Sequence, residues 1–252
     1  MDSLSLYKKS YHVEYGDTDY YKRLKLSSLF NYFQDVASLH SEIANLSIEK
    51  LQAEYGAAWV MIRILLDINR LPVSNENIQI ETWPIQPRKM EIERNFIVRD
   101  MDGNILVSAV SGWVVLDMEK REMMKIDSVI TQQYPVFLET KATDRKMGRL
   151  KPKGELQPVY KKHVGFSDID INGHVNNAKY IDYISDCFSL EKHGEYNIKS
   201  IQVNYVNEAV AGDTISLYRD ISEMSNTDKA VYIEGTDDKD GKVFFKAYIE
   251  VK

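Results

Sequence analysis

The stretch HVGFSDIDINGHVNNAKYIDYISD (163–186) repeats the earlier stretch HVEYGDTDYYKRLKLSSLFNYFQD (12–35) at a constant offset of 151 residues, 163 minus 12. Chance gives only about one or two identities in such a window. Two long copies indicate a duplicated domain rather than a solenoid of short repeats. The identical positions pair as follows: His12 with His163, Val13 with Val164, Asp17 with Asp168, Asp19 with Asp170, Tyr32 with Tyr183, and Asp35 with Asp186.

Each copy predicts a short strand, an acidic turn and then a helix. The strands are expected at 10–16 and 160–166. Apolar residues at helical spacing follow in both copies. They are Leu26, Leu29, Phe30, Phe33 and Val36 in the first, and Tyr180, Ile181, Tyr183, Ile184, Cys187 and Phe188 in the second.

Further strands are expected after each helix. Asp-Gly pairs at 102–103 and 240–241 are strong hairpin signals. A helix followed by antiparallel strands predicts an α+β fold in which the sheet curls over the helix. The predicted strands are 57–68, 78–85, 92–100 and 105–117 in the first half, and 198–208, 213–222, 229–237 and 242–251 in the second. We place an N-terminal domain at 1–138, a basic linker at 139–157 and a C-terminal domain at 158–252.

The composition is that of a soluble globular protein: 252 residues, of which 44% are hydrophobic and 28% charged. A net charge of -6 argues against nucleic-acid binding. The chain has no apolar run of membrane-spanning length and no apolar N-terminal stretch like that of a signal peptide, so no membrane span is expected. The single cysteine excludes an internal disulfide framework and a multi-cysteine metal site. These features together predict a cytoplasmic location.

The linker contains a cluster of cations. Such a run is usually a solvated surface, but it could also be a docking strip for an acidic partner. The only acidic residue among these cations is Asp144. The cations are Lys141, Arg145, Lys146, Arg149, Lys151 and Lys153.

The two halves differ in the acidic turn. Asn172 and His174 of the second half replace Tyr21 and Arg23 of the first. Asp and Asn before a helix are common N-caps, so Asp170-x-Asn172-x-His174 alone leaves a purely polar cap open. The asymmetry favours chemistry in the second half, because a structural cap need not differ between copies.

These residue types suit a polar reaction. Histidine is the usual general base near neutral pH, and a nearby carboxylate can orient it. An Asn amide can polarise a carbonyl or position water. A helix beginning at 174–176 would point backbone N–H groups toward a developing oxyanion.

The other notable residues are expected to be structural. Cys187 lies on the apolar helix face, where a cysteine usually packs as a small hydrophobe. The histidines outside the turn lack metal-ligand spacing, and the tryptophans lie in strand patterns typical of core or pocket wall. These residues are His12, His40, His163, His193, Trp59, Trp83 and Trp113.

The stretch SDIDINGHVNNAKYIDYI (167–184) resembles the acyl-acyl carrier protein thioesterases, which comprise the plant chain-terminating enzymes and their bacterial relatives. The resemblance covers most of the chain and implies two tandem hotdog domains, each a long helix wrapped by an antiparallel sheet. It extends to LSSLFNYFQDVASLHSE (26–42), AAWVMIRILLDINRLP (57–72), SAVSGWVVLDMEKR (108–121) and IQVNYVNEAVAGDTI (201–215).

The resemblance also implies site residues and a reaction. The family's catalytic residues match Asp170, Asn172, His174 and Glu208. The residue after the glutamate, often cysteine in plant members, is Ala209, so a cysteine-dependent route is not available here. Glu208 and His174 would deprotonate a water that attacks the thioester, with no metal, covalent intermediate or cofactor. The first half would form the acyl pocket, where we expect substrate contacts from Leu29, Phe33, Trp59 and Met61.

The implied function is hydrolysis of fatty acyl-acyl carrier protein, releasing a free fatty acid. The partner would be the acyl carrier protein, with no nucleic acid and no membrane span, and the chain would be a monomer or a homodimer. Three alternatives stay open: an acyl-CoA thioesterase, a non-catalytic acyl-binding module, and a purely structural duplicated domain. The sequence does not fix the length or saturation of the acyl chain.

Overall fold

The computed structural model describes residues 4–130, 137–225 and 229–252. The chain divides into two compact units. The first contains Met1–Leu24 with Asn31–Lys146, and the second contains Lys25–Phe30 with Met147–Lys252.

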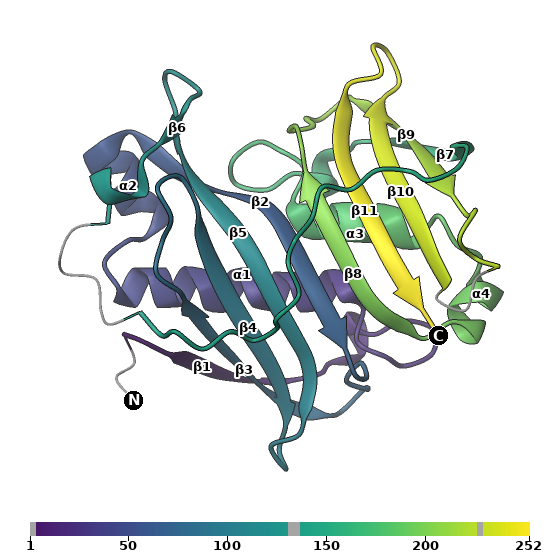
Figure 1. Ribbon diagram of the computed structural model, residues 1–252, viewed down its shortest axis with the longest axis horizontal. Helices are drawn as coiled ribbons and strands as arrows, with labels where there is room; N and C mark the ends of the chain where they lie inside the picture. The colour runs from purple at the N-terminus through teal and green to yellow at the C-terminus, as the bar shows by residue number, and fades with distance from the viewer. Residues whose placement is uncertain (1–3, 131–136, 226–228) are drawn as a thin grey trace. The chain divides into compact units, whose positions relative to one another are not determined.

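The first unit is an antiparallel sheet with a long helix across it (Figure 1). Its strand order is β1-β3-β4-β5-β2, and the short β6 pairs with β5. The strands are β1 (Tyr7–His12), β2 (Ala57–Ile68), β3 (Asn77–Pro84), β4 (Ile92–Asp100), β5 (Ile105–Asp117) and β6 (Met123–Met124). The helices are α1 (Leu26–Ile43), which belongs to this unit from Asn31 onward, and α2 (Ile48–Tyr55), with short 3-10 turns η1 (Tyr15–Asp17) and η2 (Ile126–Ser128).

The second unit repeats this plan. Its order, β7-β9-β10-β11-β8, matches the first unit strand for strand, which confirms the predicted duplication and α+β architecture. The strands are β7 (Gln157–His163), β8 (Ile198–Tyr205), β9 (Thr214–Asp220), β10 (Lys229–Asp237) and β11 (Val243–Val251). The helices are α3 (Asn177–Ser185) and α4 (Leu190–Glu195), preceded by the 3-10 turn η3 (Phe166–Asp168).

Aromatic contacts hold each helix to its sheet. Phe33 of α1 stacks on Phe96 of β4 with ring centroids 4.5 Å apart. Tyr180 of α3 packs on Phe245 of β11 at 5.1 Å. All four side chains are buried, so the apolar helix faces inferred from the sequence are the faces that form the two cores.

Several boundaries differ from the sequence prediction. β1 and β7 end at His12 and His163, because the next residues turn into η1 and η3. The apolar spacing predicted a second helix as far as Phe188, but α3 ends at Ser185, whose carbonyl contacts the His193 ring at 2.9 Å. β8 was predicted to reach residue 208, but it ends at Tyr205, which leaves Glu208 in the following loop.

The stretch predicted as a basic linker is partly neutralised by carboxylates of neighbouring strands and loops. Arg145 pairs with Asp67 at 2.9 Å, and Lys153 pairs with Glu223 at 2.8 Å. Lys141 lies 3.8 Å from Glu93. These pairs favour an anchored linker over a dedicated docking strip, because cations already paired contribute less field to a partner.

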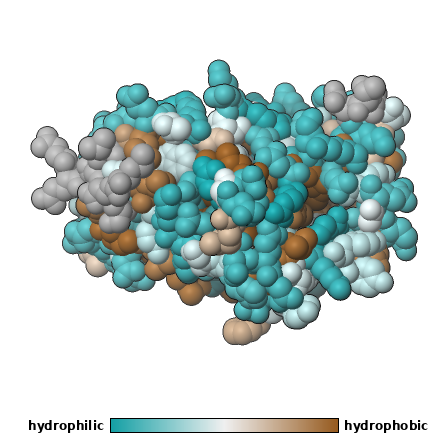
Figure 2. All heavy atoms as spheres, turned by 90° about the horizontal axis from the view of Figure 1, so that it is seen from below, coloured by the Kyte–Doolittle hydropathy of each residue, from teal (hydrophilic) through white to brown (hydrophobic). Residues whose placement is uncertain are grey.

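The described surface is mixed in polarity. On the face drawn in Figure 2, hydrophobic residues lie among hydrophilic ones. Among the helices of the described residues, none is long and apolar enough to cross a membrane.

Candidate active site

The turn between η3 and α3 is built by its own backbone. Asp170 N donates to His174 O at 2.9 Å, and Gly173 N donates to Asp170 O at 3.0 Å. Asp170 Oδ1 also accepts the N–H of Asn172 at 2.8 Å, an arrangement typical of an Asx turn. Gly173 has φ +79°, a conformation that glycine adopts without strain. This local closure brings His174 to the end of the turn, three residues before α3.

The start of α3 is capped by Asn176. Its side-chain oxygen accepts the N–H of Ala178 at 2.8 Å, and its backbone oxygen accepts that of Lys179 at 2.8 Å. The sequence predicted that N–H groups at the helix start would face an oxyanion. Because these two N–H groups already bond within the cap, that role would fall on other donors nearby, such as the exposed Asn172.

Glu208 lies in the loop 206–213 that joins β8 to β9. Val206 N and Asn207 N both donate to Phe244 O, at 2.8 and 3.1 Å, which bends the chain away from the sheet. Ala209 O then accepts the N–H of Val175 at 2.9 Å. This bond ties the loop to the turn, since it joins the residue after Glu208 to the residue after His174.

The imidazole and the carboxylate therefore meet. His174 Nε2 lies 3.4 Å from Glu208 Oε2, and their side chains are 28% and 35% exposed. An imidazole and a carboxylate at this distance, both open to solvent, can bind a water molecule and remove its proton. The resemblance implies four catalytic residues. The side chains of His174 and Glu208 approach each other directly, whereas Asp170 contacts Asn172 through the backbone N–H described above.

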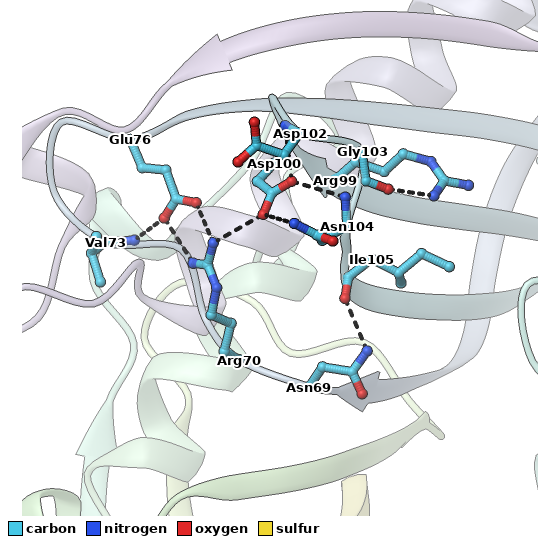
Figure 3. Close-up of polar contacts among 10 residues, drawn as sticks. All are labelled: Asn69, Arg70, Val73, Glu76, Arg99, Asp100, Asp102, Gly103, Asn104 and Ile105. Atoms are coloured by element: carbon cyan, nitrogen blue, oxygen red, sulfur yellow. Dashed lines mark hydrogen bonds and ion pairs between the residues drawn. The ribbon is translucent and has the colours of Figure 1, made fainter.

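The Glu208 loop has a counterpart in the first unit at 69–76, drawn in Figure 3. Asn75 N donates to Val13 O as Gly212 N donates to Val164 O, so the loops correspond at an offset of 137, 212 minus 75. Leu71 occupies the place of Glu208. The first-unit loop is fixed by Arg70, whose guanidinium pairs with Glu76 at 2.6 Å and Asp100 at 3.5 Å.

The four predicted pocket residues are all buried or half-buried. Trp59 packs on a cluster that includes Leu51 and donates its Nε1–H to Leu46 O at 3.3 Å. Phe33 packs on Phe96 as described, and Met61 lies in β2, where its side chain is 5% exposed. Leu29 lies in α1 and is fully buried. Their role as acyl contacts stays a prediction.

The remaining candidates have structural surroundings. Burial raises the pKa of the Cys187 thiol to about 12, so it stays protonated near neutral pH and is a poor nucleophile. His12 and His163 contact equivalent partners, Asn77 at 2.9 Å and Thr214 at 3.4 Å. Among the described residues, no three His, Cys, Asp or Glu side chains are grouped to hold a metal ion.

Comparison with protein families identifies the chain. Residues 5–134 match the acyl-ACP thioesterase N-terminal domain, and residues 154–250 match the acyl-ACP thioesterase C-terminal domain. The chain belongs to the acyl-ACP thioesterase family. The two matches cover both halves of the internal repeat, so the family resemblance predicted from the sequence is confirmed.

Two curated members of the acyl-ACP thioesterase family are similar in sequence to this chain. Oleoyl-acyl carrier protein thioesterase 1 of Arabidopsis thaliana is 24% identical over 244 residues, covering 90% of this chain and 67% of the relative. An acyl-[acyl-carrier-protein] hydrolase of Cuphea viscosissima is 27% identical over 194 residues, covering 73% and 47%. The chain thus spans about half to two thirds of the length of the curated relatives it matches.

Solved structures of the family agree over the full length. An acyl-ACP thioesterase from Bacteroides thetaiotaomicron has a TM-score of 0.87 at 25% identity, with 98% of each chain covered. The 12:0-ACP thioesterase from Umbellularia californica has a TM-score of 0.85 at 18% identity, covering 100% of this chain and 98% of the other, and supports the fold alone. These likenesses confirm the predicted double-hotdog fold.

The sequence analysis missed one residue of the site. Tyr180 was assigned only to the apolar face of the helix, but its hydroxyl accepts the N–H of Ala209, next to Glu208, at 3.3 Å. The repeat contains a usable signal, because the first half has Leu29 in place of Tyr180. A hydroxyl gained at a core position of one copy indicates a hydrogen bond that the other copy does not make.

Proposed function

We propose that this protein hydrolyses the thioester of fatty acyl-acyl carrier protein and releases a free fatty acid. The observation that carries the proposal is the 3.4 Å approach of His174 Nε2 to Glu208 Oε2. Membership of the acyl-ACP thioesterase family supports the substrate class. The partner is then the acyl carrier protein, and we retain the cytoplasmic location and the monomer or homodimer as parts of the proposal.

The reaction follows from the pair. Glu208 and His174 hold a water molecule, and as its oxygen attacks the carbonyl carbon its proton passes to the pair. The side-chain amide of Asn172 donates an N–H to the carbonyl oxygen, which becomes negative in the tetrahedral intermediate. The intermediate collapses, the carbon–sulfur bond breaks, and the pantetheine thiolate leaves and takes up the proton. Asp170 holds the N–H of Asn172 and so orients the turn.

The acyl chain is assigned to the first half of the chain, with Leu29, Phe33, Trp59 and Met61 as its proposed contacts. Each is apolar and at least half-buried, as an alkyl-binding surface requires. Met61→Ala should lengthen the preferred acyl chain if this side chain ends the pocket. The measurement is the distribution of released fatty acids by mass spectrometry, and an unchanged distribution removes Met61 from the proposal.

The main test is hydrolysis of matched acyl-carrier and acyl-CoA substrates over a series of chain lengths. We expect faster release from the carrier, and a loss of about 10²–10⁴-fold in His174→Ala. His163→Ala is the control, because this exposed histidine lies on β7 outside the turn. Faster turnover of acyl-CoA would replace the carrier by CoA. No hydrolysis of either series would leave an acyl-binding module and end the proposal.

A further inference from the structure

The hydroxyl of Tyr180 lies at the junction between α3 and the loop that carries Glu208. The residue is 3% exposed, and its ring packs on Phe245 and on Tyr205, with centroids 5.1 and 5.8 Å away. A side chain held on this many sides cannot move to another rotamer without opening the core. Its hydroxyl is therefore a fixed point beside the loop.

Ala209 is held at both ends of its backbone. Its N–H donates to Tyr180 Oη at 3.3 Å, and its carbonyl accepts the N–H of Val175 at 2.9 Å. The second bond leads to the neighbour of His174, and the first leads to α3. Glu208 precedes Ala209 directly, so the two bonds together fix the backbone from which its carboxylate extends.

The first half of the chain keeps one of these bonds and lacks the other. Leu24 N donates to Pro72 O at 2.8 Å, which is the counterpart of the bond from Val175 to Ala209. Pro72 has no N–H, however, and Leu29, which stands in place of Tyr180, has no hydroxyl. The tyrosine and the N–H that it binds occur together in the half that has the glutamate, and both are replaced in the half that has Leu71.

The charged groups that act on the Tyr180 phenol include two carboxylates of the candidate active site, those of Glu208 and Asp170. Burial raises the pKa of Tyr180, and the carboxylates of Glu208, Asp213 and Asp170 raise it further, against the opposing effect of the Ala209 N–H. The phenol therefore stays protonated throughout the neutral range. Its oxygen accepts the Ala209 N–H while its own hydrogen remains to donate.

We infer that Tyr180 is a positioning residue for the thioester hydrolysis, holding the Glu208 carboxylate within reach of the His174 imidazole through the backbone of Ala209. This inference rests on the proposed function for its kinetic consequence, but its structural consequence stands independently. An alternative is that the hydroxyl only provides a hydrogen-bond acceptor for the buried N–H of Ala209. The two roles differ because only a positioning role requires the Glu208 carboxylate to move when the hydroxyl is removed.

Tyr180→Phe tests the inference with the loss of a single oxygen. Because the loss of a hydrogen bond in a buried site weakens the position of the group that it held, we expect kcat to fall about 10–100-fold, or about 1.4–2.7 kcal/mol, with KM within about twofold. Tyr160→Phe is the matched control, since it also removes one phenol hydrogen bond, the half-buried one to Tyr183 O at 2.7 Å, without touching the loop. Near-normal kcat in Tyr180→Phe would overturn the inference.

Two further measurements separate positioning from simple structural support. In a Glu208→Gln background, Tyr180→Phe should add little to the loss, because residues that act through one another are not additive; full additivity would contradict the inference. A crystal structure of Tyr180→Phe should show the Glu208 carboxylate withdrawn from His174, and an unchanged approach would also overturn it. The structural readout decides even if the wild type hydrolyses no thioester, which is the result that defeats the proposed function.

Discussion

The turn 15–24 of the first unit and the turn 166–175 of the second have the same backbone and different side chains. Asp19 N donates to Arg23 O at 2.7 Å, as Asp170 N does to His174 O at 2.9 Å. The carboxylates of Asp19 and Asp170 each accept the N–H two residues on, at 2.9 and 2.8 Å. One backbone arrangement thus carries a turn closed by an Asp–Arg pair in the first unit and a candidate active site in the second.

The difference lies in what the carboxylate holds. In the first unit Asp19 pairs with the Arg23 guanidinium at 3.0 Å, which uses its charge within the turn. In the second, His174 faces Glu208 across the gap between turn and loop. The comparison shows that Asp19 and Asp170 make the same turn bond in both copies, and that the two copies differ at residues 172, 174 and 208, on which the proposed chemistry depends.

The largest effect should come from giving the second unit the first unit's residue at 208. Glu208→Leu, which copies Leu71, removes one partner of the His174 pair and should lower turnover about 10²–10⁴-fold. The fold should be unaffected, because the side chain lies on a partly exposed loop. Steady-state kinetics with a thermal melt measures both. Leu71→Gln is the control in the first unit, and normal turnover in Glu208→Leu would show that the glutamate is not needed.

The next largest expected effect is a loss of stability of the first unit at low pH. His40 of the first unit is fully buried. Its Nε2 lies 3.0 Å from Leu4 O, and its Nδ1 lies 3.0 Å from a nitrogen of the Arg94 guanidinium. The ring of Tyr7 stacks on the imidazole. Burial and the Arg94 charge lower its pKa from 6.5 to about 4. Between pH 6.5 and 4 this histidine is therefore protonated in the unfolded chain and neutral in the folded one. The free energy of unfolding consequently decreases as the pH falls toward 4.

The expected loss is about 3 kcal/mol over that pH range, since each pKa unit corresponds to about 1.4 kcal/mol. His40→Gln cannot titrate and should lose this part of the pH dependence. The measurement is denaturant unfolding at several pH values, with the exposed His163→Gln in the second unit as control. Equal pH slopes in the wild type and His40→Gln would contradict the prediction.

A third change separates the two tasks of Asp170. Asp170→Asn keeps an oxygen that accepts the Asn172 N–H, so the turn should form and turnover should fall less than about tenfold. Asp170→Ala loses that bond and should cost about tenfold or more, because Asn172 is then no longer held. Steady-state kinetics compares the two. If Asp170→Asn is as damaging as Asp170→Ala, the charge itself acts in the reaction and the scaffold interpretation is wrong.

Several elements could be predicted from sequence because their signals are local. β2, β4, β5 and β10 have the predicted bounds, since apolar or β-branched runs and Asp-Gly turns delimit them. The helix faces and the duplication were also predicted, because both appear as spacing.

What the sequence could not give depends on hydrogen bonds between distant segments. Glu208 was placed at the end of a strand predicted over 198–208, and only the two bonds to Phe244 O show the bend. Tyr180 was assigned to a core face because periodicity records apolar area and ignores a hydroxyl. The approach of His174 to Glu208 likewise needs the bond between Val175 and Ala209, which joins residues far apart in sequence.

The smallest effect concerns the left-handed position of the turn. Lys22 of the first unit has φ +61° where Gly173 of the second has φ +79°. A side chain in this conformation costs about 1–2 kcal/mol, whereas glycine loses about 0.5–1 kcal/mol more chain entropy on folding. The two terms nearly cancel, so Lys22→Gly should change the free energy of unfolding by less than about 1 kcal/mol, with a slight gain expected. Denaturant titration measures it. Gly173→Lys, the reverse change, should be slightly destabilising by a similar amount, and a loss above about 2 kcal/mol there would mean that the second turn needs glycine for a reason its first-unit counterpart does not share.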